Sequence, residues 1–523
     1  MKIERTRNAK RNMLVGWTQS ILSMLFPFVT RTAMIYSLGV EYLGLNSLFT
    51  SVISVLNLAE LGVGSAMVFS MYKPIAENNE KKICALMNLY KIYYRIIGVV
   101  IAIIGIALIP VLPYLIHGDV PSGINVYILY LLNLASTVFT YWLFGYKNCL
   151  FSAHQRIDIY NIVSICISFL TLVCQLWSLF IARNYYLYLI VAIITGIINN
   201  IVVALIATKM YPNYHANGKL DKTERKLINK RVTDLFTAKI GAIVVNSSDT
   251  IVISAFLGLS ILAVFQNYYY IMTSVRGFIT IIFSSCMAGI GNSLVTESKQ
   301  KNFYDMKKFT FIIAWLSGFC SVCFLCLYQP FMRIWMGENL ILDYNVVICI
   351  VIQFYIMEIN QLLNLYKDAA GLWHRDRFRP LITAMANLIM NLILVQFWGL
   401  YGIMISTVVS ALIVGMPWLL HNLFTVLFDR KFLLPFLKDL LYYMLTTIVV
   451  CIAMSIVCSF VKLNDITTIV IRFIICCVGS NFLFLCAYSR KNEFVDVLKL
   501  IDNITKNKFR LEKNLSGWVR KND

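Results

Sequence analysis

Residues 2–38 of the chain read KIERTRNAKRNMLVGWTQSILSMLFPFVTRTAMIYSL. A basic segment precedes an apolar run that can cross a bilayer core of about 30 Å as a helix, which takes roughly 20 residues. The run is too long for the core of a signal peptide, and it lacks a small-residue cleavage site. The stretch therefore predicts a first membrane helix that is retained in the protein, with its basic end in the cytoplasm.

The composition of the whole chain extends this interpretation. Hydrophobic residues make up 59% of the sequence and charged residues only 14%, and the mean hydropathy is +0.73. A soluble domain is nearer half apolar and a quarter charged. The formal net charge of +20 is dispersed among linkers and forms no compact basic module, so we expect no nucleic-acid partner.

Fourteen apolar runs follow one another along the chain, and each predicts a transmembrane helix. The first seven predicted spans are 13–38, 47–71, 90–116, 126–151, 159–181, 186–208 and 236–258. The second seven are 261–295, 309–335, 344–370, 381–397, 400–428, 440–460 and 466–488. The fold class is therefore all-α, a polytopic membrane protein.

The basic residues of the linkers set the orientation. They fall in every second linker, and the outer linkers hold only Arg183, Arg333 and Lys462. This asymmetry places both termini in the cytoplasm. The longest inner linker separates the first six spans from the next six, and two further spans follow these at the C-terminal end. The predicted parts are a first lobe 1–210, a linker 211–235, a second lobe 236–430, two further spans 431–488 and a basic tail 489–523.

Polar residues recur at helical spacing on four of the predicted spans, so each set shares one helix face. The sets are Ser20, Ser23, Pro27 and Arg31; Thr50, Ser54, Asn57 and Glu60; Lys239, Asn246 and Asp249; and Tyr269, Arg276 and Thr280. Four such faces indicate a wet interior. Lys239 lies close to a cytoplasmic helix end, where a lysine also snorkels to the surface.

Charged side chains near mid-depth cost about 2.5–3.5 kcal/mol each on insertion scales, so each needs a partner, a cavity or a function. In one interpretation, Arg31 and Arg276 line a cavity for an anionic substrate, because a guanidinium binds phosphate through a fork of donors. In the other, Arg31 with Glu60 and Arg276 with Asp249 form structural salt bridges. The residues alone leave both open.

Three carboxylates within the spans are candidates for ion coupling, namely Glu60, Asp249 and Glu358. Burial favours the protonated form of a carboxyl group, which allows proton exchange. Structural pairing explains each of them equally well. The sequence does not distinguish coupling to a proton from coupling to sodium.

No cofactor, metal site or catalytic residue is predicted. Most of the 14 cysteines lie in apolar runs, where cysteine acts as a small hydrophobic residue. Cys320, Cys323 and Cys326 form a C-x-x-C-x-x-C string, but it lies within a span without a nearby histidine or fourth cysteine. There is also no glycine-rich phosphate loop.

Four segments near the start resemble polysaccharide flippases, of the Wzx type, from the multidrug/oligosaccharidyl-lipid/polysaccharide (MOP) superfamily. They are 27–31 (PFVTR), 43–49 (LGLNSLF), 58–66 (LAELGVGSA) and 72–76 (YKPIA). A looser likeness extends to 246–249 (NSSD) and 258–260 (GLS). Along the rest of the chain, only the topology of the membrane spans resembles that of the family.

This resemblance implies two six-helix lobes with two extra helices in a bacterial plasma membrane. It further implies alternating access that moves undecaprenyl-diphosphate-linked oligosaccharide from the inner to the outer leaflet. Arg31 and Arg276 would meet the diphosphate in a central cavity, joined by Asn57, Asn246 and Lys239. Expected partners are the lipid-linked oligosaccharide, membrane lipids, and the polymerase and glycosyltransferases of the same pathway.

Two alternatives remain. A multidrug antiporter of related architecture would suit cationic drugs, whereas two mid-span arginines favour an anionic cargo. A membrane-embedded polysaccharide polymerase or glycosyltransferase would present acid and base residues on a large outer loop. The outer linkers 117–124 and 336–343 are short, and His117 and Asp119 are too few for such a site. The favoured hypothesis is therefore a carrier and not an enzyme.

Overall fold

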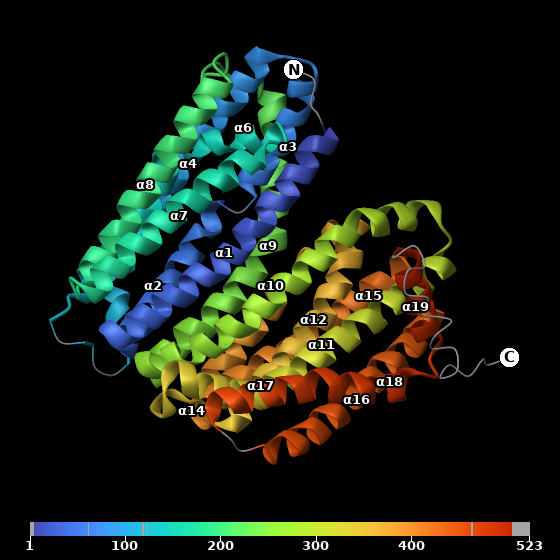
Figure 1. The fold of residues 1–523 in the computed structure, drawn as a ribbon. Helices are drawn as coiled ribbons and strands as arrows, with labels where there is room; N and C mark the ends of the chain where they lie inside the picture. Colours follow the sequence, from blue (N-terminus) through green and yellow to red (C-terminus); the bar gives the residue numbers. More distant parts are fainter. Residues whose placement is uncertain (1–4, 61, 118–119, 122, 462–463, 505–523) are drawn as a thin grey trace. The chain divides into compact units, whose positions relative to one another are not determined.

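The computed structural model describes residues 5–60, 62–117, 120–121, 123–461 and 464–504 (Figure 1). Throughout these residues the regular structure is helical, with no strand. The chain groups into two compact units, a first unit that ends at Gln266 and a second unit that begins at Asn267. The predicted fold class, an all-α polytopic membrane protein, is confirmed.

The first unit contains nine complete helices among the described residues. They are α1 (Arg5–Ser37), α2 (Val40–Leu56), α3 (Val63–Ala76), α4 (Glu80–Ala107), α5 (Val126–Trp142), α6 (Asn148–Ala153), α7 (Ile157–Phe180), α8 (Tyr185–Met210) and α9 (Lys222–Leu257). In this unit α1 packs on α7, α7 on α8, α8 on α5 and α5 on α4, while α2 packs on α9. The next helix, α10 (Leu259–Thr296), begins in the first unit and continues into the second.

The second unit is organised around α11, which packs on α12, α16, α17 and α19. Its helices are α11 (Lys299–Met336), α12 (Tyr344–Ala369), α13 (Trp373–Asp376), α14 (Arg379–Ser410), α15 (Met416–Val426), α16 (Leu433–Ser459), α17 (Asp465–Ile475), α18 (Asn481–Tyr488) and α19 (Asn492–Ile504). Short π-helical turns join α14 to α15 and α17 to α18.

Nine helices of the described part are long and apolar enough to cross a membrane, or ten if the bent pair α5–α6 counts as one span. Each of the 14 predicted spans falls on one helix or one broken helix. Large apolar side chains remain exposed on these helices, such as Ile103, Leu205, Phe397 and Val449, each more than 60% exposed. Such surfaces suit contact with lipid, where helices satisfy their own backbone groups.

Several boundaries differ from the prediction. Helix α4 begins at Glu80, ten residues before the predicted span, because the Asn79 side chain accepts a hydrogen bond from the backbone N–H of Lys82 and caps the helix. Helix α9 begins at Lys222, inside the predicted linker 211–235. The predicted tail contributes α19, whose Phe494, Val497 and Leu498 join a buried hydrophobic cluster of the second unit.

The predicted spans 381–397 and 400–428 correspond to two separate helical arms that meet within the element labelled α14, with a sharp reversal between them at Gly399, where φ is 54° and ψ is −129°. A straight helix would place Asn387 and Thr407 about 30 Å apart at 1.5 Å per residue. Instead, Asn387 Nδ2 donates to Thr407 Oγ1 over 3.0 Å. The two arms therefore lie side by side, and a Cβ on Gly402 would meet the Leu394 carbonyl oxygen at 2.3 Å.

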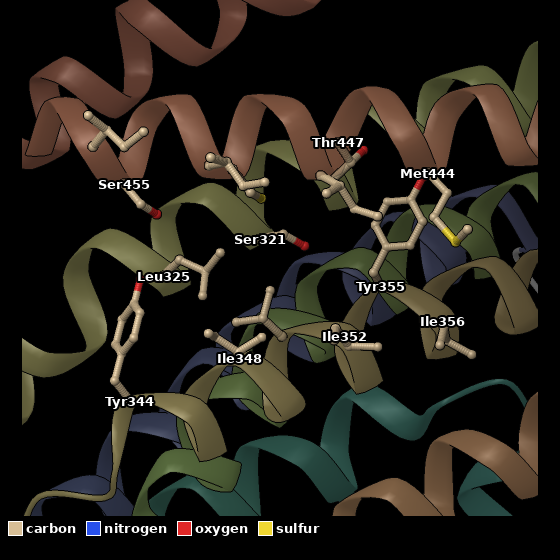
Figure 2. Close-up of a pocket in the computed structure, with 15 residues that line it drawn as sticks. Ser321, Leu325, Tyr344, Ile348, Ile352, Tyr355, Ile356, Met444, Thr447 and Ser455 are labelled. Carbon is tan, nitrogen blue, oxygen red and sulfur yellow. The ribbon is translucent and has the colours of Figure 1, made fainter.

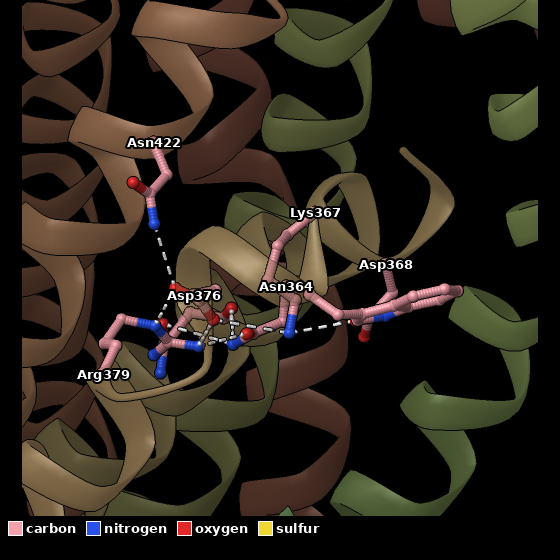
Figure 3. Close-up of polar contacts among 8 residues, drawn as sticks. Asn364, Lys367, Asp368, Asp376, Arg379 and Asn422 are labelled. Carbon is pink, nitrogen blue, oxygen red and sulfur yellow. Dashed lines mark hydrogen bonds and ion pairs between the residues drawn. The ribbon is translucent and has the colours of Figure 1, made fainter. Parts of the chain in front are cut away.

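A buried polar network secures the connection between α12 and α14 (Figure 3). Asp376 is 2% exposed, and its two carboxylate oxygens lie 2.7 and 2.8 Å from Arg379 nitrogens. Asn422 donates to the same carboxylate over 3.2 Å, and Lys367 lies 3.5 Å from it. Arg379 also donates to Asn364 over 2.8 Å. Because every charge here has a partner, the network anchors this loop against the bundle.

We expect Gly399→Ala to destabilise the second unit, because an L side chain is strained at this backbone conformation by about 1–3 kcal/mol. The apparent midpoint of thermal unfolding in detergent should fall. Gly196→Ala is the matched control, since Gly196 lies within α8 with nothing near its added Cβ. Equal midpoints for the two variants would contradict the role of Gly399.

Candidate functional site

A polar cavity of about 430 Å³ lies within the first unit, between α1, α2, α7 and α8. Arg31, Pro27 and Ser23 of the predicted polar face of the first span line it, and Thr50 of the second span does too. Other polar groups of its wall are Gln19, Asn46, Thr171, Gln175 and Tyr188. The cavity therefore presents several hydrogen-bond donors and acceptors among apolar lining residues.

Arg31 gives this cavity its charge. Its side chain is half-buried and close enough to Tyr188 for an electrostatic interaction. Among the described residues that line the cavity, Arg31 carries the only formal charge, and none of them is a carboxylate. A cavity of this kind favours an anion over a cation.

Glu60 and Asn57 lie in a short 3-10 turn between α2 and α3, Asn57–Glu60. Glu60 accepts hydrogen bonds from Tyr94 over 2.7 Å and from Tyr141 over 3.2 Å, and Tyr141 also lies 3.2 Å from Asn57 Oδ1. Tyr90 donates to the Tyr94 hydroxyl over 2.7 Å. Glu60 is thus held by tyrosine hydroxyls rather than by Arg31.

The turn at Glu60 breaks the second predicted span. Gly62 follows it with φ 87°, in the left-handed region, and α3 starts at the next residue. A broken helix exposes backbone groups that can serve an ion or a substrate within a membrane. Glu60 therefore combines a carboxylate, a helix break and a shell of hydroxyl groups.

Arg276 and Glu358 form an ion pair within the second unit. Arg276 Nε lies 3.0 Å from Glu358 Oε1, joining α10 to α12. The Glu358 side chain is fully buried, whereas the Arg276 side chain is 24% exposed. One turn further along, Gln361 donates to Thr280 over 2.7 Å. Arg276 therefore pairs with Glu358 rather than with Asp249.

The ion pair between Arg276 and Glu358 does not use all of its hydrogen-bonding capacity. Glu358 Oε2 is buried and has no hydrogen-bond partner among the described residues. A buried carboxylate with one free oxygen next to a partly exposed arginine can lose its charge by protonation or exchange its partner. The sequence predicted Arg276 and Glu358 for separate roles, and only the structure brings them together.

The remaining predicted residues lie on α9. Asp249 is 6% exposed and has interaction partners of its own. The side chains of Lys239 and Asn246 lie outside the described residues. Their predicted contact with a substrate stays a prediction.

An apolar pocket of about 530 Å³ lies within the second unit, between α11, α12 and α16 (Figure 2). Ile348, Ile352 and Ile356 of α12 lie across it from Met444 of α16, and Ile448 of α16 also lines it. The hydroxyl-bearing residues at its edge are Ser321, Tyr344, Tyr355, Thr447 and Ser455. No sequence pattern predicts this pocket, because its wall consists of ordinary apolar helix faces.

The chain matches no family model and no curated protein sequence. Its fold is similar to that of solved membrane carriers. A structure of lipid II flippase MurJ in an inward closed conformation aligns with a TM-score of 0.64 and 14% identity, covering 91% of this chain and 99% of that one. An inward-facing multidrug resistance MATE family transporter of the MOP superfamily aligns at 0.59 and 14% identity, covering 78% and 97%.

A MOP superfamily transporter from Pyrococcus furiosus also aligns, with a TM-score of 0.51 and 13% identity over 80% of this chain and 96% of that one. Identities this low establish a shared fold and nothing about the molecule carried. The fold expected from the sequence resemblance is therefore confirmed at the level of architecture.

We expect Glu358→Ala to destabilise the second unit by about 3–5 kcal/mol, because it leaves a largely buried arginine without its partner. Arg276→Ala combined with Glu358→Ala should recover much of this loss. Thermal unfolding of the purified protein in detergent measures both. Glu297→Ala, at an exposed pair with Lys301, should change stability by less than about 1 kcal/mol. A double variant no more stable than the single one would contradict the pairing.

Proposed function

We propose that the protein is a flippase that moves an undecaprenyl-diphosphate-linked oligosaccharide from the inner to the outer leaflet by alternating access. The product would enter the synthesis of a cell-surface polysaccharide. No covalent bond is made or broken. The observation that carries the proposal is the polar cavity in the first unit whose one charged lining residue, among those described, is Arg31.

A diphosphate head group fits this cavity for physical reasons. A guanidinium remains charged at any cellular pH and offers paired donors to phosphate oxygens. In a site shielded from water, this interaction is stronger than at an exposed surface. Asn46, Gln175 and Ser23 add neutral hydrogen-bonding groups suited to sugar hydroxyls. The cavity therefore supplies one cation and several neutral partners, which matches an anionic glycan carrier lipid.

The lipid part of such a substrate needs an apolar surface. The pocket between α11, α12 and α16 offers branched apolar side chains. A prenyl chain can lie there without leaving an apolar medium. This pocket supports a substrate with a long hydrocarbon chain over a small hydrophilic one.

Two carboxylates within the helical bundle, the buried Glu358 and the partly buried Glu60, provide means of coupling transport to an ion gradient. Protonation of Glu358 removes its charge and frees Arg276 to bind a phosphate, whereas ionised Glu358 competes with that phosphate. Glu60, within its group of tyrosines, is the corresponding carboxylate of the first unit. With Asp249 they form the predicted coupling set, for protons or for sodium.

The shared fold alone supports a carrier of either lipid or drugs, because both a lipid II flippase and multidrug transporters adopt it. The positive charge of the cavity favours a carrier of anionic lipid over a carrier of cationic drugs. A cationic drug is repelled by Arg31 and finds no carboxylate among the cavity's lining residues. The chain is a multi-pass membrane protein, and we place it in a bacterial plasma membrane with both termini in the cytoplasm, beside the polymerase and glycosyltransferases of its pathway.

We expect Arg31→Ala and Arg276→Ala each to lower translocation of the lipid-linked oligosaccharide by roughly 10- to 100-fold, since a hydrogen bond to a charged group is worth about 1.5–3 kcal/mol. Arg→Lys variants should recover only part, because lysine lacks the fork of donors. Transport into proteoliposomes measures the effect. Arg430→Ala, at an exposed inner linker, is the control. Full transport by both alanine variants would remove the arginines from the site.

Deletion of the protein in its native cell should cause lipid-linked oligosaccharide to accumulate in the inner leaflet. Enzymatic labelling of the glycan in sealed, oriented vesicles reports the leaflet. A multidrug antiporter predicts altered drug sensitivity without this accumulation. A polymerase predicts single repeat units in the outer leaflet instead.

A further inference from the structure

Three cysteine thiols meet inside the second unit, far apart in sequence and on separate helical segments. Cys326 lies on α11, Cys458 near the end of α16, and Cys476 at the start of the π-helical turn Cys476–Ser480. All three are buried, and their sulfur atoms lie within 4.8 Å of one another. The Cys458 and Cys476 sulfurs are 3.9 Å apart. Among the described residues, no other group of three potential metal ligands comes this close.

This arrangement has the size of a metal site. Three sulfurs around one ion with bonds near 2.3 Å lie about 4.0 Å from one another. The observed separations need only small rotations of the cysteine side chains to reach this value. Among the described residues, the group whose ligand atoms lie within 4.8 Å of one another has three sulfur ligands, Cys326, Cys458 and Cys476.

The surroundings supply a second and independent observation. Arg472, on α17, donates to the Cys326 carbonyl oxygen over 3.2 Å and to the Val461 carbonyl oxygen over 3.0 Å. Its Nε atom is buried and has no hydrogen-bond partner among the described residues. Arg472 also lies close enough to Cys458 for an electrostatic interaction.

A cation at this position needs a compensating charge. No carboxylate of the described residues pairs with Arg472, and two neutral carbonyl groups do not neutralise a guanidinium in an apolar medium. Thiolates are the anions that the neighbouring side chains can provide. A bound metal stabilises thiolates, because a coordinating thiol loses its proton.

We propose that Cys326, Cys458 and Cys476 form a binding site for a soft metal ion, specifically Cu(I). Soft thiolate ligands select Cu(I) and Zn(II), and structural Zn(II) sites are almost always four-coordinate, whereas Cu(I) accepts three sulfur ligands. Three thiolates around Cu(I) carry a net charge of about −2, which Arg472 offsets in part. The displaced thiol protons pass to solvent on binding.

The bound ion would clamp the last two spans to α11. Helix α16 and the α17–α18 span both pack on α11, and the three ligands come from these three segments. The π-helical turn at Cys476 supports the assignment, because such turns occur frequently at functional sites. This site is distinct from the Arg31 cavity and from the Arg276 pair, and it does not depend on the proposed function.

The test is an anaerobic titration of the purified full-length protein in detergent with Cu(I), buffered by a chromogenic Cu(I) chelator. We expect one ion per chain and an increase in the apparent unfolding temperature. The triple variant Cys326→Ser, Cys458→Ser and Cys476→Ser should bind at least about 100-fold more weakly, since outer partners alone contribute roughly 10- to 100-fold. The control triple variant, Cys166→Ser, Cys174→Ser and Cys486→Ser, alters cysteines outside the cluster and should bind like the wild type.

Arg472→Met should weaken Cu(I) binding by roughly 10-fold, the effect expected of a charge adjacent to the ligands, whereas Arg472→Lys should keep most of the affinity. X-ray absorption of the loaded wild-type protein should show a shell of sulfur atoms near 2.3 Å, the length of a metal–thiolate bond. This measurement does not require any variant to fold. The proposal is overturned by absence of a stoichiometric ion, by equal binding in the triple serine variant, by nitrogen or oxygen ligands, or by preference for Zn(II).

Discussion

Backbone amide groups in hydrocarbon find no water, so each must be satisfied within the protein. This constraint explains why the described part of the chain is helical throughout. It also determines where a helix can be interrupted. The reversal at Gly399 is bridged by the hydrogen bond between Asn387 and Thr407, and the turn at Asn57–Glu60 lies beside tyrosine hydroxyls. In both places side-chain hydrogen bonds secure the chain around the interruption.

The same constraint applies to charged side chains, and each one found at depth has a different local solution. Glu358 pairs with Arg276, Glu60 accepts hydrogen bonds from tyrosines, and Arg472 donates to backbone carbonyl groups next to thiols. Arg31 instead lines a cavity. Arg31 is the one charged residue among the described lining residues of that cavity. This position is the reason for giving Arg31 the leading part in the proposed transport.

Arg276 combines the features of a paired charge and of a charge that a ligand can reach. The side chain of its partner, Glu358, is fully buried, whereas the Arg276 side chain is 24% exposed. Such a pair can exist in two states, one with the arginine bound to the carboxylate and one with the arginine released after protonation. A carrier needs an element of this kind, because its affinity for substrate must change between its two faces. The pair thus connects the predicted substrate residue to the predicted coupling residue.

The sequence by itself determined the membrane environment, the helical class, the approximate position of every span and the presence of charges at depth. These features depend on length, periodicity and composition, which are local properties of the chain. Tertiary structure alone decided which charges meet. The spacing of Arg276 and Glu358 along the sequence does not indicate that they pair. The sequence also does not indicate that Glu60 lies among tyrosine hydroxyl groups.

The cysteines also show that a sequence pattern does not reveal contacts between distant helices. The string of Cys320, Cys323 and Cys326 lacked further ligands along the sequence, so no metal site was expected there. Packing of α11 against α16 and α17 brings Cys458 and Cys476 to Cys326, from residues more than a hundred positions away. Contacts between side chains on different helices depend on how the helices pack, and a pattern read along one helix does not contain that information.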